Sequence, residues 1–168
     1  MMDFETVFQA VTAHVTRAAE KLRQHGLVAG TLTVFFHTNR YRPDRPQYTG
    51  SKTARIMSMS SDTFELVQTA RRCAEAAWPH DKTREYGFTK AGVMVNDLLP
   101  IADRRQTLFD RSEASPSPAM IALDKINDRF GKKTMVLASE GLKQSWKMRA
   151  DHRSPRYTTR LSDLPVVR

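Results

Sequence analysis

The stretch Thr31-Leu32-Thr33-Val34-Phe35-Phe36-His37 decides the fold class of this chain. Apolar side chains at every second position share one face of an extended backbone, while Thr33 and Phe35 share the other, which predicts a strand. Upstream, residues 3–25 carry apolar side chains at three- and four-residue steps, which predicts an amphipathic helix that ends at Gly26. The chain therefore opens with a helix followed directly by a strand.

Further elements follow after a loop over residues 39–51 that contains two prolines and a glycine. A second strand is predicted over residues 53–59, a second helix over 63–78 and a third strand over 88–95. The order helix, strand, strand, helix, strand predicts an α+β fold, with a small mixed sheet covered by two helices.

The chain divides by composition into three parts. The α+β unit covers residues 1–100, and a charged segment with two Ser-Pro steps predicts a linker over residues 101–118. Residues 119–168 predict a small basic C-terminal domain, with a short helix over 119–130, a short strand over 134–138 and an irregular remainder.

The charge of the chain bounds its partners. It has 168 residues, a formal net charge of +9 and a sequence pI of about 10.1, which favours a polyanionic partner. Nucleic acid is the first candidate and an anionic membrane surface the second. Cys73 is the only cysteine, which suits a reducing cytoplasm. The sequence contains no signal peptide and no apolar run of about 20 residues, so no membrane partner is expected.

Basic residues gather in and after the loop, interleaved with Tyr41 and Tyr48. Such cations can follow a phosphate backbone, and the tyrosines could stack on bases. The alternative is a solvated basic loop. No zinc-finger spacing and no aromatic RNA-binding signature is present, so sequence-tolerant binding is expected. With a lysine of the third strand added, the candidate DNA-binding residues are Arg40, Arg42, Arg45, Lys52, Arg55 and Lys90.

Two further segments predict contacts with partners. In the tail, residues 154–160 combine hydroxyl groups with arginine and tyrosine, which suits phosphate and sugar contacts. The tail could equally wrap on the protein, with Trp146 and Tyr157 as anchors. Residues 106–109 place two adjacent apolar side chains in a polar, proline-flanked segment, which is typical of a short docking peptide. Alternatively, this peptide folds back onto the domain.

Catalytic chemistry finds little support in the sequence. No histidine lies at a metal-ligand spacing from another ligand, and no glycine-rich phosphate loop is present. Cys73 lies in the middle of a predicted helix, where a core position is expected. The sequence therefore predicts no catalytic residue, no metal site and no cofactor.

Four segments, in the right order, resemble the C-terminal part of UmuC-type Y-family translesion DNA polymerases. Residues 18–23 are similar to the first helix of that family's little-finger domain, and residues 90–94 to its last strand. Residues 108–110 fall where the family carries its sliding-clamp-binding peptide. The string Ser154-Pro155-Arg156-Tyr157-Thr158-Thr159-Arg160 resembles the family's C-terminal end and is the most specific of the four.

This resemblance implies a little finger that grips the template-primer duplex through its backbone. It also implies a peptide that binds the sliding clamp through Gln106, Leu108 and Phe109, and a UmuD-like partner in the SOS response. The resemblance singles out Arg156, Tyr157 and Arg160 in the C-terminal motif. Arg105 stands where the family's clamp peptide has glutamine, unless Gln106 serves with a shift of one residue, so weakened clamp binding is expected.

The same resemblance implies that the catalytic palm and the first strand of the little finger are absent from the sequence. An exposed sheet edge follows from the missing strand. The leading hypothesis is a non-catalytic DNA-binding and clamp-docking module. The second is a pure protein-interaction module that binds the clamp or a UmuD-like subunit without DNA. The third hypothesis is a small hydrolase that uses histidines such as His37 or His80, but no sequence motif supports it.

Overall fold

The computed structural model describes residues 3–79, 81, 86–104, 116–142, 144–147 and 154–164. The helices are α1 (Phe4–Gln24), α2 (Thr63–Ala77) and α3 (Pro118–Phe130), and the strands are β1 (Leu27–Thr38), β2 (Thr49–Ser60) and β3 (Phe88–Pro100). Short 3-10 turns lie at Ile101–Asp103, Ala138–Glu140 and Leu161–Asp163.

The first two helices begin where an aspartate caps the free backbone N–H groups. The Asp3 carboxylate accepts a hydrogen bond of 2.8 Å from the Thr6 amide, and Asp62 accepts from the amides of Phe64 and Glu65. Each helix then buries one apolar face.

The three strands pair in the order β2-β1-β3, and both pairings are antiparallel. The predicted α+β class is therefore confirmed, although the sheet in the described residues is antiparallel rather than mixed. Each strand is longer than its prediction. Pairing with β3, for example, carries β1 back through Ala29, a residue of low strand propensity.

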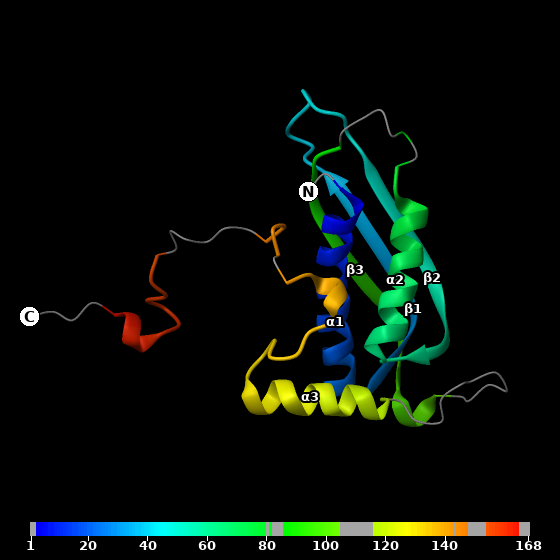
Figure 1. Cartoon of the computed structure of the whole chain (residues 1–168), viewed down its shortest axis with the longest axis vertical. Coiled ribbons are helices and arrows are strands. Elements are labelled where there is room, and N and C mark those ends of the chain that lie inside the picture. Colours follow the sequence, from blue (N-terminus) through cyan, green and yellow to red (C-terminus); the bar gives the residue numbers. More distant parts are fainter. Residues whose placement is uncertain are drawn as a thin grey trace, which may run out of the picture.

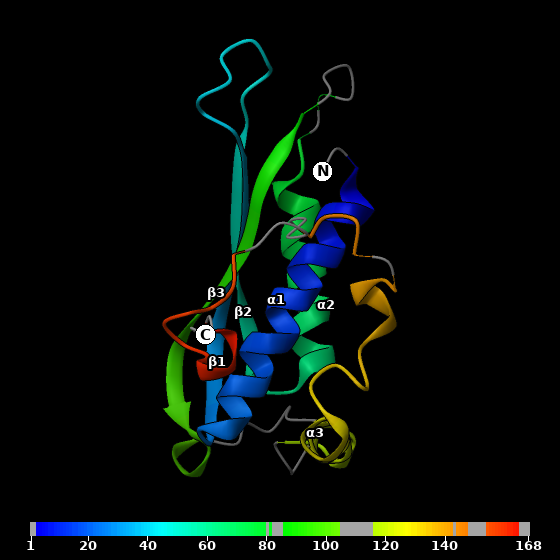
Figure 2. The same cartoon turned by 90° about the vertical axis from the view of Figure 1, so that its left-hand side faces the viewer.

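Helices α1 and α2 cover one face of the sheet, as the side view in Figure 2 shows. Leu32, Val34 and Phe36 of β1 point to this face and are fully buried. They pack in one core with the apolar faces of both helices (Figure 1). The buried thiol of Cys73 belongs to this core, and burial raises its pKa, so the expected core position is confirmed.

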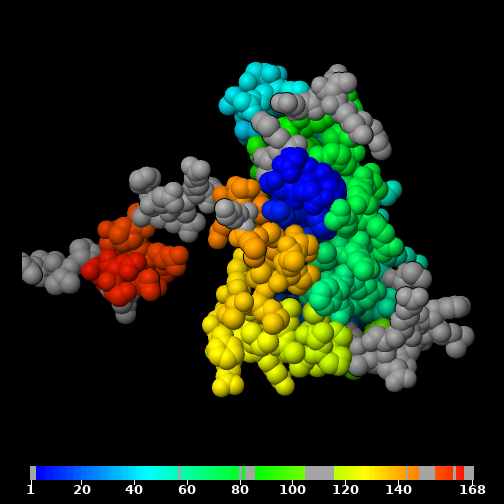
Figure 3. Space-filling view, viewed as in Figure 1, coloured from blue at the N-terminus to red at the C-terminus, as the bar shows by residue number. Residues whose placement is uncertain are grey.

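Residues 116–142 pack against the two helices. Met120 and Leu123 of α3 and Leu137 beyond it join the same hydrophobic core. Figure 3 shows α3 and the segment that follows it lying against α1 and α2. The division of the chain at residue 118 into linker and separate domain stays a prediction.

The strand predicted over residues 134–138 is wrong. The Asn127 side chain donates to the Met135 carbonyl at 3.0 Å and accepts from the Met135 amide at 2.8 Å. The Thr134 amide donates to the carbonyl of Gly131. Local side-chain and turn bonds thus take the backbone groups that a strand would need for pairing.

Candidate nucleic-acid interface

The strand register decides which candidate cations share a surface. Directly paired residues of antiparallel strands point to the same face. Thr31 pairs with Arg55 and His37 with Lys90, whereas Val34, which faces the helices, pairs with Lys52. Arg55 and Lys90 therefore point to the helix-free side of the sheet, which we call the open face. Lys52 was expected to join them but lies on the helix side of an edge strand.

The open face is mostly polar and flat. Thr33 and Thr53 share a hydrogen bond of 2.8 Å between their hydroxyl groups. The Phe35 ring lies over Gly92, where an added Cβ would come within 2.6 Å of the ring. Met94 pairs with Thr33 and is half exposed. Hydroxyls, one covered ring and flanking cations suit contact with a sugar-phosphate backbone.

Three further candidate cations, Arg40, Arg42 and Arg45, lie in the loop between β1 and β2. The guanidinium of Arg42 donates to the Asp44 carboxylate at 3.2 and 3.3 Å. This hydrogen bond is the main reason that the pKa of Asp44 falls below its ordinary value of 3.8. Arg42 thus makes an exposed ion pair with Asp44, while the guanidinium groups of Arg40 and Arg45 make no ion pair with any residue that the structure describes.

The C-terminal motif forms a compact turn. The Arg156 carbonyl accepts from the amides of Thr159 and Arg160, and the Arg156 amide donates to the Asp163 carboxylate at 3.2 Å. Arg156, Tyr157 and Arg160 are all exposed. Trp146 is half-buried with its ring 6.2 Å from that of His14, so the expectation that Trp146 anchors the chain to the body agrees with the structure.

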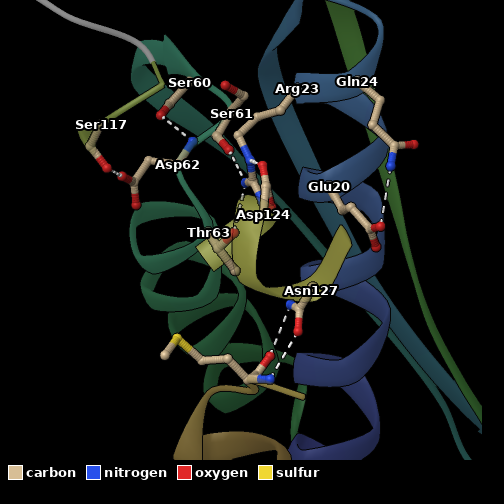
Figure 4. Close-up of polar contacts among 11 residues, drawn as sticks. Glu20, Arg23, Gln24, Ser60, Ser61, Asp62, Thr63, Ser117, Asp124 and Asn127 are labelled. Atoms are coloured by element: carbon tan, nitrogen blue, oxygen red, sulfur yellow. Dashed lines mark hydrogen bonds and ion pairs between the residues drawn. The ribbon is translucent and has the colours of Figure 1, made fainter. Parts of the chain in front are cut away.

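Figure 4 shows a polar junction that sequence reasoning missed. The Arg23 guanidinium, whose side chain is 3% exposed, donates to both carboxylate oxygens of Asp124 at 2.6 and 2.7 Å. Arg23 also donates to the Ser61 carbonyl and the Thr63 hydroxyl. The Ser117 hydroxyl donates to Asp62 at 2.6 Å. The junction ties α3 to α1 and to the start of α2.

The expected clamp-binding residues, Gln106, Leu108 and Phe109, lie outside the described residues, as does His80. Among the residues that are described, no group of three or more His, Cys, Asp or Glu side chains could hold a metal ion. None of the helices in the described part of the chain is long and apolar enough to cross a membrane.

Comparison with known proteins places the chain in a family. A model described as the impB/mucB/samB family C-terminal domain matches residues 1–108, and a domain of unknown function, DUF4113, matches residues 118–167. Because the first match covers more than half of the chain, the chain belongs to the impB/mucB/samB family. This agrees with the expected resemblance to the C-terminal part of UmuC-type proteins.

Individual relatives support the same assignment. The chain is similar to protein UmuC of Salmonella typhimurium, with 34% identity over 99% of this chain and 39% of the relative. It is also similar to protein SamB of Salmonella typhimurium (30% identity, 98% of this chain and 38% of the relative). Protein MucB of Escherichia coli is 33% identical over 95% of this chain and 37% of the relative. The chain thus spans about two-fifths of the length of these curated relatives. No solved structure matches it.

Proposed function

We propose that this chain is a DNA-binding module of the translesion-polymerase type, which acts in SOS damage tolerance in the cytoplasm and carries no polymerase chemistry of its own. Family membership supports the polymerase context. The main support for DNA binding is the register of the three strands. It puts Arg55 and Lys90 on the open face, together with the hydroxyl groups of Thr33 and Thr53.

The spacing of these two cations suits a nucleic-acid strand. Their partners on β1, Thr31 and His37, are six positions apart, which corresponds to about 20 Å along the strand. That length spans about six nucleotides of one DNA strand. Separate cations with hydroxyl groups between them suit contacts with the DNA backbone, so binding without sequence readout is expected.

The experiment compares charge removal on two faces. Arg55→Ala with Lys90→Ala is expected to weaken duplex DNA binding by about tenfold or more, because two phosphate contacts are lost. Arg17→Ala with Lys21→Ala removes the same charge from α1, on the helix side, and serves as the matched control. Equal losses from the two pairs would show that only net charge matters, and would contradict an interface on the open face.

Docking to a sliding clamp and to a UmuD-like subunit completes the proposal. It rests on the resemblance of residues 106–109 to the family's clamp peptide and on the relatedness to UmuC. Leu108→Ala with Phe109→Ala is expected to abolish clamp binding in a pull-down while DNA affinity is retained. If clamp binding persists in that variant, or if DNA binding is lost with it, the docking role of the peptide is wrong. A wild-type chain that binds the clamp but no DNA would favour the pure interaction module.

A further inference from the structure

The loop between β1 and β2 projects beyond the ends of both helices (Figures 1 and 2). Its own hydrogen bonds nevertheless hold it in one shape. The Gln47 side-chain amide donates to the carbonyls of Arg42 and Arg45 at 2.8 and 3.1 Å. The Thr38 hydroxyl donates to the side-chain oxygen Oε1 of Gln47 at 2.9 Å, and the backbone amide of Tyr48 donates to the same hydroxyl. Two successive turns, from Asn39 to Arg42 and from Arg42 to Arg45, complete the loop.

The base of the loop is fixed to the core. The Tyr48 hydroxyl donates to the Ala77 carbonyl at the end of α2 at 2.8 Å. The Tyr48 ring lies 5.2 Å from Tyr86 and 6.3 Å from Phe36, centre to centre. Such aromatic contacts stiffen the place where the strands enter the loop. The shape of the loop therefore does not depend on a ligand.

One aromatic ring of this ordered loop is left in water. Tyr41 is 91% exposed, although its amide is held by the Asn39 side chain at 3.0 Å. Arg40 and Arg42 flank it in the sequence. A single exposed ring is common on protein surfaces. An exposed ring on a hydrogen-bonded loop, next to two arginines in the sequence, can however serve as a platform on which an unpaired base stacks.

The same loop also lines a small pocket. It has a volume of about 130 Å³ and is lined by Arg42, Arg45, Gln47, Gly87 and other residues of the loop and the adjacent strand. Arg45 supplies a guanidinium that is free of ion pairs within the described residues. The pocket thus offers a cation to an oxyanion of phosphate size.

We propose that the loop between β1 and β2 is a preformed binding site for an unpaired DNA nucleotide, in which Tyr41 stacks on the base and the pocket at Arg45 takes an adjacent phosphate. This inference rests on the proposed DNA-binding function and adds a ligand that the open face does not select. The open face follows the backbone of a duplex, whereas a stacking ring needs a base that is not paired.

The test uses two labelled DNAs, a blunt duplex and the same duplex with a single-stranded thymidine overhang. Tyr41→Ala is expected to weaken binding of the overhang DNA by about tenfold, as for loss of one base stack, and to change blunt-duplex binding by less than about twofold. Tyr41→Phe keeps the ring and is expected to bind both DNAs like the wild type. Phe130→Ala removes an exposed aromatic ring at the end of α3 and serves as the matched control.

Arg45→Ala supplies the second measurement. It is expected to weaken binding of the overhang DNA and to reduce the slope of log K against log salt by about one, because one phosphate contact disappears. Circular dichroism checks that each variant is folded. Overhang binding that is unchanged in Tyr41→Ala would overturn the stacking site, as would an equal loss on both DNAs. The proposed function is tested separately. It stands in either case if Arg55→Ala with Lys90→Ala weakens binding to the blunt duplex. If the wild type binds neither DNA, both proposals fail.

Discussion

Arg23 is the residue at which three elements of the molecule meet. Its guanidinium joins the end of α1 to Asp124 of α3 and to the Ser61 carbonyl before α2. The pair is bidentate, and the arginine side chain is buried while that of Asp124 is 26% exposed. A buried pair of this kind contributes little when intact but costs much when one partner is removed.

Asp124→Asn is therefore expected to lower the free energy of unfolding by about 3 kcal/mol, because it leaves the Arg23 charge buried without its counter-ion. Urea unfolding followed by circular dichroism measures the change. Asp128→Asn, one turn further along α3 and exposed, is the control and should fall within about 0.5 kcal/mol of the wild type. Equal effects from the two substitutions would mean that the buried pair has no special role.

Asp44 competes with phosphate for Arg42. Because the hydrogen bond from Arg42 holds its pKa below 3.8, Asp44 is ionised throughout the neutral range. Asp44→Asn is expected to strengthen duplex binding severalfold and to make the salt slope steeper by about one, since Arg42 becomes available to the backbone. Titration of labelled DNA at pH 6 and pH 8 should give the same gain, because the carboxylate is charged at both. Weaker binding by the variant would show that Asp44 instead holds the loop in its binding shape.

At the scale of elements, β1 shows what sequence can predict. The alternation in residues 31–37 correctly predicts the strand and its buried face. It could not predict that Leu27–Gly30 extend the strand, because pairing with β3 outweighs the low propensity of Ala29 and Gly30. It also could not place Lys52, since the face of a residue on β2 depends on register. Arg23 and Asp124 lie 101 positions apart, and no local pattern connects them.

The close approach of β2 to the end of α2 predicts that an alanine at Gly50 destabilises the protein. A Cβ added at Gly50 would lie 2.6 Å from the Ala77 carbonyl oxygen, a backbone atom. Gly50→Ala is thus expected to destabilise the protein by about 2 kcal/mol, through forced separation of the two elements. Gly87→Ala, where the added Cβ meets only Arg45 Nη1 at 3.7 Å, should have little effect on thermal unfolding. Unchanged stability in Gly50→Ala would contradict the tight contact.

At the scale of the whole molecule, the region matched by DUF4113 is not uniform. Its first part shares the main core through Met120, Leu123 and Leu137. None of the side chains described over residues 154–160 and 162–164 belongs to that core. We therefore expect the two parts to differ in stability.

Hydrogen exchange measures this difference directly. The amides of α3 are expected to exchange only with global unfolding, like those of α1, because both helices bury residues in one core. The amides of residues 154–164 should exchange much faster, since their hydrogen bonds are exposed to water. Fast exchange throughout α3 would instead support the predicted separate domain after residue 118.

DNA binding is the central claim, and its salt dependence tests it most directly. Arg42 is paired with Asp44 and Lys52 lies on the helix side, so four candidate cations remain for the backbone, namely Arg40, Arg45, Arg55 and Lys90. Anisotropy of a labelled duplex titrated at several salt concentrations should give a plot of log K against log salt with a slope of about −4, whatever the DNA sequence. A slope near zero, or no binding at low salt by folded protein, would contradict the account.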